Sequence, residues 1–181
     1  MLNETTHPPA ARCIWLTGLS GAGKSTMAQA LATQLAAQGL RYCLLDGDAL
    51  RRGLNSDLGF SPADRAQSVR RTAHVARLMV DAGVTAVVAL ISPYRADRAA
   101  ARALFAPGTF VEVFVDTPVA VCEQRDTKGL YAKARAQQIT DMTGIGSDYE
   151  APLKPDVRLA CAEQALHVCA AQIAGYLGLA P

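Results

Sequence analysis

Eight consecutive residues near the start of the chain, from Gly18 to Ser25, have the types and spacing of a phosphate-binding loop. They read G-x-x-x-x-G-K-S and lie between a short apolar run and a segment typical of a helix. The glycines let successive backbone N–H groups turn toward one anion, and the dipole of the following helix points to the same place. A polyphosphate is therefore the expected ligand. The loop residues predicted to bind it are Gly18, Ser20, Gly21, Ala22, Gly23, Lys24, Ser25 and Thr26.

Four side chains in or near this loop are suited to phosphoryl transfer. Lys24 is placed to reach the β and γ phosphates, and the Ser25 hydroxyl is placed to bind Mg²⁺. Asp46 and Asp48 flank a glycine directly after the apolar segment 41–45. Ligands bind at the carboxyl ends of the strands in an open parallel sheet. We expect Asp46 to hold Mg²⁺ through water and Asp48 to accept the proton of an acceptor hydroxyl. The structural alternative is that the two carboxylates only cap the following turn.

The elements that must position these side chains alternate between strands and helices along the chain. Strands are predicted at 13–17, 41–45, 84–91, 110–115 and 157–160, and helices at 24–38, 61–83, 96–105, 117–125 and 162–177. Such alternation predicts an α/β fold with a parallel sheet of about five strands and helices on both faces. We expect residues 1–11 to form a flexible tail, residues 12–181 to form a single domain, and the glycine-containing segment 126–155 to form a helical lid over the site.

Composition limits the class of protein. A chain of 181 residues with 50% hydrophobic and 19% charged residues fits one globular domain. A net charge of +2 gives no long-range field suited to a nucleic acid polymer. The five cysteines form no C-x-x-C pair, which argues against a disulfide framework and a zinc site. With no export signal at the N-terminus and no apolar run long enough to cross a bilayer, we expect a cytoplasmic protein that does not bind membranes.

The phosphate loop alone does not distinguish kinases from GTPases and motor ATPases. The chain has no N-K-x-D motif for reading guanine and no apolar run that ends in an Asp-Glu pair. Small size and a glycine-containing lid favour a small-molecule kinase. In that reaction the protein aligns donor and acceptor and neutralises charge on the transferring phosphoryl group.

A set of motifs in one order closely resembles the adenylylsulfate kinase family. They are residues 18–26, Leu45-Asp46-Gly47-Asp48, Leu54-Asn55 with Asp57 to Ser61, Asp64-Arg65, Ile91 to Arg95, and Lys128 to Tyr131. The resemblance runs from about Ile14 to the C-terminal helix. It implies transfer of the γ-phosphoryl group of ATP, with Mg²⁺, to the 3′-hydroxyl of adenosine 5′-phosphosulfate, the reaction that gives 3′-phosphoadenosine 5′-phosphosulfate in sulfate assimilation.

The resemblance also implies which residues bind the acceptor. Arg51 and Arg65 can hold the phosphosulfate, and the Phe60 ring can stack on adenine. Arg125 and Lys128 can add positive charge near the phosphates. Ser92 occupies a position proposed in this family as a phosphoserine, and we expect it to contribute to the catalytic site with Lys24, Asp46 and Asp48. The predicted acceptor-binding residues are Asp48, Arg51, Asn55, Phe60, Arg65, Ser68, Ile91, Ser92, Lys128 and Leu130.

The chain departs from the family pattern mainly around the acceptor. Ser68 stands where relatives have asparagine, Met142 where they have phenylalanine, and Gly146 where they have aspartate. A second hypothesis therefore keeps the kinase but changes the acceptor to another nucleotide-like compound. A third is a nucleotide-binding regulatory or scaffold domain that has lost turnover, although Lys24, Ser25, Asp46 and Asp48 are all present. The resemblance further implies a homodimer, and it is compatible with association with an ATP sulfurylase that supplies the acceptor.

Overall fold

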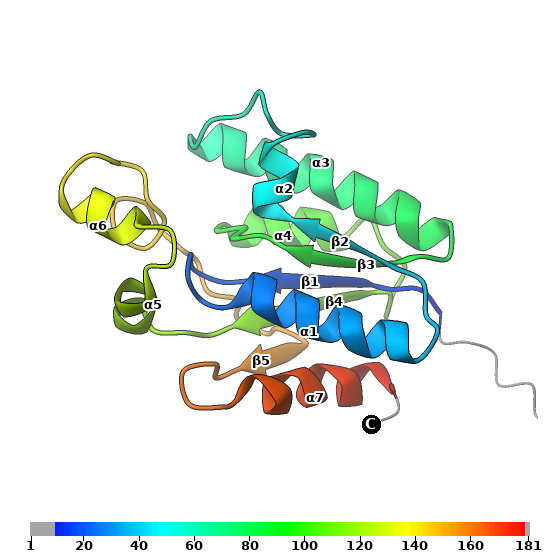
Figure 1. The fold of residues 1–181 in the computed structure, drawn as a ribbon. Helices are drawn as coiled ribbons and strands as arrows, with labels where there is room; N and C mark the ends of the chain where they lie inside the picture. The colour runs from blue at the N-terminus through cyan, green and yellow to red at the C-terminus, as the bar shows by residue number, and fades with distance from the viewer. Residues whose placement is uncertain (1–9, 180–181) are drawn as a thin grey trace, which may run out of the picture.

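A computed structural model describes residues 10–179, and the expected tail at residues 1–11 lies largely outside them. All the pairings in its one sheet are parallel, and the strand order is β2-β3-β1-β4-β5 (Figure 1). The predicted α/β fold with a five-stranded parallel sheet is confirmed. The strands are β1 (Cys13–Thr17), β2 (Tyr42–Asp46), β3 (Thr85–Ala89), β4 (Phe110–Val115) and β5 (Val157–Leu159).

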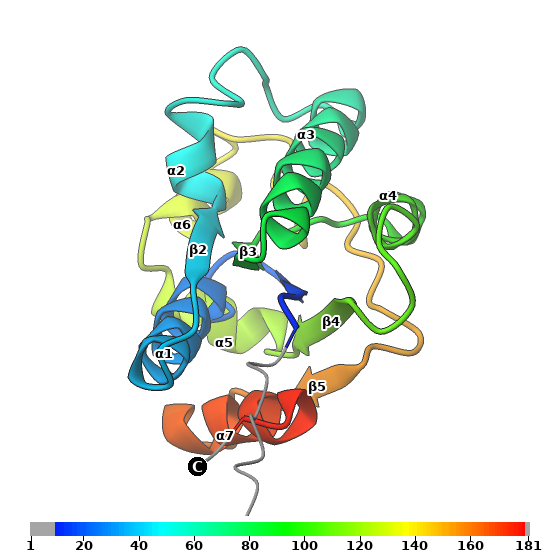
Figure 2. The same cartoon turned by 90° about the vertical axis from the view of Figure 1, so that its right-hand side faces the viewer.

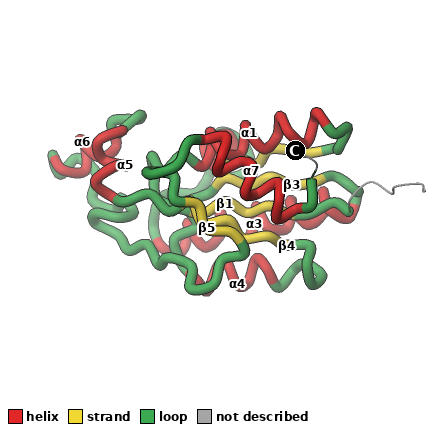
Figure 3. The backbone as a smooth tube through the Cα atoms, turned by 90° about the horizontal axis from the view of Figure 1, so that it is seen from below, coloured by secondary structure: helices red, strands yellow, loops and turns green. Residues whose placement is uncertain are grey.

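Helices cover both faces of this sheet, as expected for strands joined by right-handed crossovers. Helices α1 and α7 lie against one face and α3 and α4 against the other, which is clearest in Figures 2 and 3. The helices are α1 (Lys24–Ala37), α2 (Gly47–Arg51), α3 (Pro62–Asp81), α4 (Arg95–Arg102), α5 (Val119–Arg125), α6 (Leu130–Arg135) and α7 (Leu166–Leu177).

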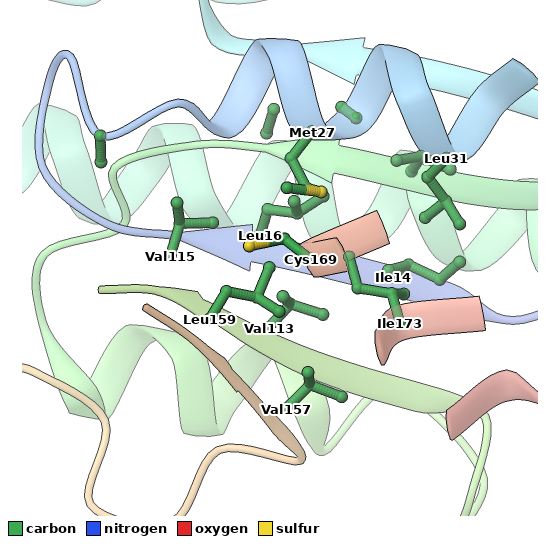
Figure 4. Close-up of a cluster of buried hydrophobic side chains, with 14 of the residues drawn as sticks. Ile14, Leu16, Met27, Leu31, Val113, Val115, Val157, Leu159, Cys169 and Ile173 are labelled. Carbon is green, nitrogen blue, oxygen red and sulfur yellow. The ribbon is translucent and has the colours of Figure 1, made fainter. Parts of the chain in front are cut away.

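The core has two parts because alternate residues of β1 point to opposite faces of the sheet. Ile14 and Leu16 pack with Leu31 of α1 and Ile173 of α7 (Figure 4). Trp15, which is fully buried, packs on the other face with buried residues of α3 and α4. A strand covered on both sides has no polar face, which is why its sequence reads as a continuous apolar run.

Helix α3 forms as its sequence predicts, whereas helix α2 is missed by the sequence analysis. Ser61 caps α3 by accepting a hydrogen bond from the Asp64 amide, and a proline follows as the first helical residue. No helix is predicted from the sequence directly after Asp46, but Asp46 caps the short helix α2 by accepting from the Asp48 amide. This geometry places Asp48 in the first turn of a helix at the carboxyl end of β2.

The carboxyl ends of the strands all meet at one end of the sheet. The phosphate loop, α2, α5 and α6 are gathered at this end, on the left of Figure 1. Segment 126–155 contains α6 and an irregular stretch that returns to β5. Residues far apart in the sequence therefore contribute to one site there.

Candidate active site

The phosphate loop is folded tightly against β4 and holds Lys24 inside it. A Cβ at Gly18 would lie 2.6 Å from the carbonyl oxygen of Val115, and Gly18 has a φ of 150°, so only glycine fits without strain. Lys24 Nζ donates to the carbonyl oxygens of Gly18 and Leu19 at 2.9 and 2.6 Å. Burial lowers the pKa of Lys24 to about 8. The ammonium group is therefore desolvated where phosphates would meet it.

Ser25 and Asp46 form a donor set suited to a magnesium ion. Ser25 Oγ donates to Asp46 Oδ2 at 2.6 Å, so the remaining lone pairs of the hydroxyl are free to face a cation. Mg²⁺ is commonly bound by one or two protein oxygens together with substrate phosphates and water. Among residues 10–179 no group of three or more His, Cys, Asp or Glu side chains could hold a metal by itself. The pair therefore fits an ion that arrives with a polyphosphate.

Asp48 lies beside this pair and contacts the lid segment. Lys128 Nζ donates a hydrogen bond to Asp48 Oδ2, and both side chains are about half exposed, at 50% and 54%. The contact places a positive charge directly beside the Asp48 carboxylate. Asp46, Asp48 and Lys128 thus bring together β2, α2 and the segment after α5.

Two guanidinium groups flank the exposed ring of Phe60. The Arg51 guanidinium carbon lies 4.1 Å from the ring centroid and that of Arg65 lies 5.7 Å from it. Burial lowers the pKa of Arg51, and the positive charge of Arg65 lowers it further. An anion bound between these cations would relieve their repulsion. Phe60 is 57% exposed, which leaves part of its ring available for stacking on a base.

The Ser92 hydroxyl is engaged in two hydrogen bonds within the protein. It accepts from Trp15 Nε1 at 3.1 Å and donates to Thr17 Oγ1 at 3.0 Å. The residue is buried, and its φ of 40° is rare for a residue with a side chain. This geometry does not support the catalytic role predicted for Ser92. It favours a role in holding the end of β3 in the cavity wall.

Asn55 lies differently from what the sequence predicts, whereas its neighbour Ser68 lines the cavity as predicted. Asn55 is 1% exposed and does not line the cavity, so the prediction that it binds the acceptor is not supported. Its Nδ2 instead donates to Ser68 Oγ at 3.0 Å, while its Oδ1 is buried and has no hydrogen-bond partner among residues 10–179. Because Ser68 Oγ accepts from Asn55, its own hydrogen can be donated toward a ligand.

One cavity of about 1060 Å³ joins these groups, which is larger than most single-ligand pockets. Of the predicted site residues, only Gly18 and Asn55 do not line it. The sequence analysis missed a second part of the wall, from the end of the lid segment and the start of α7. These residues carry no chemical motif, and only the fold brings them to the cavity; they are Gln138, Ile139, Thr140, Asp141, Thr143, Cys161, Gln164, Leu166 and Cys169.

Near its N-terminal end, segment 126–155 is attached to the phosphate loop. Arg125, at the end of α5, points Nη1 at the carbonyl oxygens of Gly21 and Ala22, both at 3.5 Å. Tyr131 of α6 is buried and donates from its hydroxyl to the carbonyl of Ser20 at 2.9 Å. Leu130, which precedes it, lines the cavity.

Near its C-terminal end, segment 126–155 is attached to the loop that follows β3 through one buried arginine. Arg98 donates to the carbonyl oxygens of Ser92 and Glu150 at 2.6 and 2.7 Å, and to Glu112 Oε1 at 2.8 Å. The Glu150 amide also donates to the carbonyl of Pro93 at 2.9 Å. Segment 126–155 is thus joined to the site at both ends.

A parallel α/β sheet, a phosphate loop with a buried lysine, a hydroxyl–carboxylate pair and an acidic residue in one cavity define a P-loop kinase. The chain belongs to the adenylylsulphate kinase family, because residues 10–160 match the sequence model of that family. It is 61% identical to an adenylyl-sulfate kinase of Burkholderia ambifaria over 160 residues, which are 88% of each chain.

Solved structures agree with this assignment. An APS kinase from Mycobacterium tuberculosis in complex with AMPPNP and APS superposes with a TM-score of 0.90, at 48% identity, over 94% of this chain and 99% of that one. A hexameric APS kinase from Thiobacillus denitrificans matches with a TM-score of 0.71 and 34% identity, over 96% of this chain and 30% of that one.

Proposed function

We propose that the chain transfers the γ-phosphoryl group of ATP to the 3′-hydroxyl of adenosine 5′-phosphosulfate. The observation that carries this proposal is the single cavity in which the phosphate loop faces Asp48 and the Arg51–Phe60–Arg65 cluster. A kinase must hold both nucleotides in one enclosed space so that donor and acceptor oxygens lie in line. Family membership and the bound ligands of the Mycobacterium tuberculosis structure support the same pair of substrates.

Each group then has a defined task. The loop amides and Lys24 bind the phosphates, and Ser25 and Asp46 would hold Mg²⁺, which would neutralise phosphate charge. Asp48 accepts the proton of the attacking 3′-hydroxyl. Arg51 and Arg65 bind the phosphosulfate, Phe60 stacks on its adenine, and Ser68 donates a hydrogen bond to it.

Positive charge from the lid segment completes the site. We propose that residues 12–181 act as one domain and that segment 126–155 covers the bound nucleotides. Lys128 and Arg125 would then lie beside the phosphates and stabilise the charge that develops during transfer. Excluding water from the cavity strengthens these interactions and prevents hydrolysis of ATP.

The deciding experiment is a coupled assay of ADP release with Mg-ATP. Adenosine 5′-phosphosulfate is compared with AMP, adenosine and no acceptor. Strong stimulation by the phosphosulfate alone is expected. Stimulation by a different nucleotide with ATP binding intact would instead favour the hypothesis of an altered acceptor, in which Ser68, Met142 and Gly146 form the changed surface. ATP binding with no turnover on any acceptor would favour a regulatory domain.

None of the helices in the described part of the chain is both long and apolar enough to span a membrane. We propose a cytoplasmic protein that forms homodimers, as the hexameric relative supports self-association. Association with an ATP sulfurylase would supply the acceptor directly. Size-exclusion chromatography with light scattering tests the oligomeric state.

A further inference from the structure

Two thiols lie in contact in the cavity wall, in a part of the chain that the proposed reaction does not use. Cys161 follows β5, Cys169 lies in the first turn of α7, and their sulfur atoms are 3.7 Å apart. A disulfide bond is about 2.05 Å long, so the sulfurs need to approach by less than about 2 Å. We propose that Cys161 and Cys169 form an intramolecular disulfide under oxidising conditions, and that this bond weakens binding of the donor nucleotide.

The other three cysteines do not offer such a pair. Cys13 and Cys122 are fully buried, and no sulfur contact with another cysteine is found for them or for Cys43 within residues 10–179. Cys161 is half-buried and Cys169 is buried behind it, and both line the cavity. A small oxidant that enters the cavity therefore meets Cys161 first and leaves Cys169 as the resolving thiol.

The chemistry requires an external oxidant, and a low-molecular-weight disulfide is sufficient. The thiolate of Cys161 attacks one sulfur of that disulfide, forms a mixed disulfide and releases one small thiol. The thiolate of Cys169 then attacks the sulfur of Cys161 and expels the second small thiol. The two protein thiols are oxidised and the small disulfide is reduced to two thiols, so protons and electrons balance.

The rate of this exchange should depend strongly on pH. Burial raises the pKa of the Cys161 thiol to about 12, so little thiolate exists near neutral pH. Because the thiolate is the attacking species, the rate should rise about tenfold per pH unit between about pH 7 and pH 9. Slow oxidation near neutral pH would keep the pair reduced except under sustained oxidising conditions.

The disulfide would act on ATP through Arg125. Arg125 Nη2 donates to the carbonyl of Cys161 at 3.2 Å, while its Nη1 faces the phosphate loop. Gln164 and Leu166, which lie between the two cysteines, also line the cavity. Drawing Cys161 toward α7 therefore moves the partner of Arg125 and the wall beside the loop. A displacement of about 1 Å in a binding site can change rates up to about a hundredfold. We expect the Kd for an ATP analogue to rise at least about threefold.

The bond itself is tested by mass spectrometry of the full chain after treatment with oxidised glutathione. The wild type should lose the mass of two hydrogen atoms and two sites for alkylation, and a peptide map should show the crosslink between Cys161 and Cys169. Cys161→Ser and Cys169→Ser should lose the crosslink, whereas the control Cys43→Ser should keep it. Five alkylatable thiols in the treated wild type, or a crosslink between other cysteines, would overturn the proposal.

The effect on ATP is tested by equilibrium binding of an ATP analogue before oxidation, after oxidation and after reduction with dithiothreitol. In the wild type and in Cys43→Ser, oxidation should weaken binding and dithiothreitol should restore it. In Cys161→Ser, oxidation should leave binding unchanged. Equal affinity in fully crosslinked protein would overturn the effect on the nucleotide. The inference depends on the proposed function in one respect, namely that ATP is the nucleotide bound at the phosphate loop. Neither readout uses the acceptor, so a wrong acceptor assignment would leave both results unchanged.

Discussion

Lys128 donates a hydrogen bond to Asp48 across the cavity mouth, joining the lid segment to the first turn of α2. The Lys128 ammonium group contacts the carboxylate that we expect to accept the proton of the acceptor hydroxyl. A positive charge at this position can also face the phosphates of a bound substrate. The contact therefore joins the segment that we propose as a lid to the residue that we propose as the proton acceptor.

Replacing Asp48 by asparagine should remove the proton acceptor while keeping the shape of the site. We expect kcat to fall about a hundredfold to ten-thousandfold, because general base catalysis contributes about that much. The affinity for ATP, measured by calorimetry, should persist. The matched control is Asp57→Asn, since Asp57 is also an exposed carboxylate in an ion pair, 2.6 Å from Arg71, but does not line the cavity. Unchanged turnover in Asp48→Asn would exclude Asp48 as the base.

Binding of ATP should weaken above about pH 8 because Lys24 loses its proton there in the free protein. Its pKa in the folded protein is about 8, below its ordinary value of 10.5. Phosphates favour the charged ammonium, so binding should take up a proton and weaken by up to about tenfold per pH unit above that value. Calorimetry in buffers of different ionisation enthalpy measures this proton uptake.

The same shift sets the sign of the pH dependence of stability. The unfolded chain binds more protons at Lys24 than the folded chain between about pH 8 and pH 10, so the free energy of unfolding without nucleotide should rise with pH there. Lys24→Arg is the control for both pH effects, on ATP binding and on stability, because arginine stays charged throughout. Binding of ATP that is independent of pH in the wild type would contradict the role of Lys24.

Replacing Asn55 by alanine should lower stability rather than donor binding. The change removes the hydrogen bond to Ser68 and leaves a small cavity, which costs about 1–3 kcal/mol in the free energy of unfolding. For a chain of this size we expect the melting temperature to fall by several degrees, about 3 to 8 °C. The KM for ATP should not change. Ser56→Ala, at the exposed neighbouring position, is the control. A melting temperature equal to that of the wild type would show that the buried contact is not stabilising.

A side chain at Gly146 should displace the end of the lid segment. A Cβ there would lie 1.9 Å from the carbonyl oxygen of Thr140, so the aspartate of relatives does not fit this conformation. Thr140 lines the cavity, and its displacement should raise the KM for the acceptor about tenfold with little effect on the KM for ATP. Gly53→Ala is the control because nothing lies within 4 Å of a Cβ there. Equal acceptor kinetics in the two variants would contradict a role for this close approach.

The donor half of the site could be predicted from sequence because its geometry is local. The phosphate loop, Lys24 and Ser25 are contiguous, and the glycine spacing alone fixes the turn. Asp46 and Asp48 follow a strand that was located by its apolar run. Helix α2 was missed because it has only five residues, although its N-cap residue, Asp46, is of a type that favours a helix start.

The acceptor half was harder to predict because its contacts join distant segments. Asn55 carries a family motif but is turned toward Ser68, thirteen residues away, rather than into the cavity. Ser92 is at the expected strand end, yet its hydroxyl bonds to Thr17 and Trp15 of another strand. None of these three partners could be identified from spacing along the chain. Motif residues thus located the site but not the direction of each side chain.

The three hydrogen bonds of Arg98 have a consequence for amide hydrogen exchange. One buried guanidinium contacts Ser92, Glu112 and Glu150, and losing any one partner would leave a buried charge less well compensated. These three positions should therefore open together, as one cooperative unit. The Glu150 amide should exchange about as slowly as the amides of β4, while amides of segment 137–146 exchange faster. Exchange followed by mass spectrometry would show the boundary between the part of the lid segment that belongs to the sheet and the part that opens on its own.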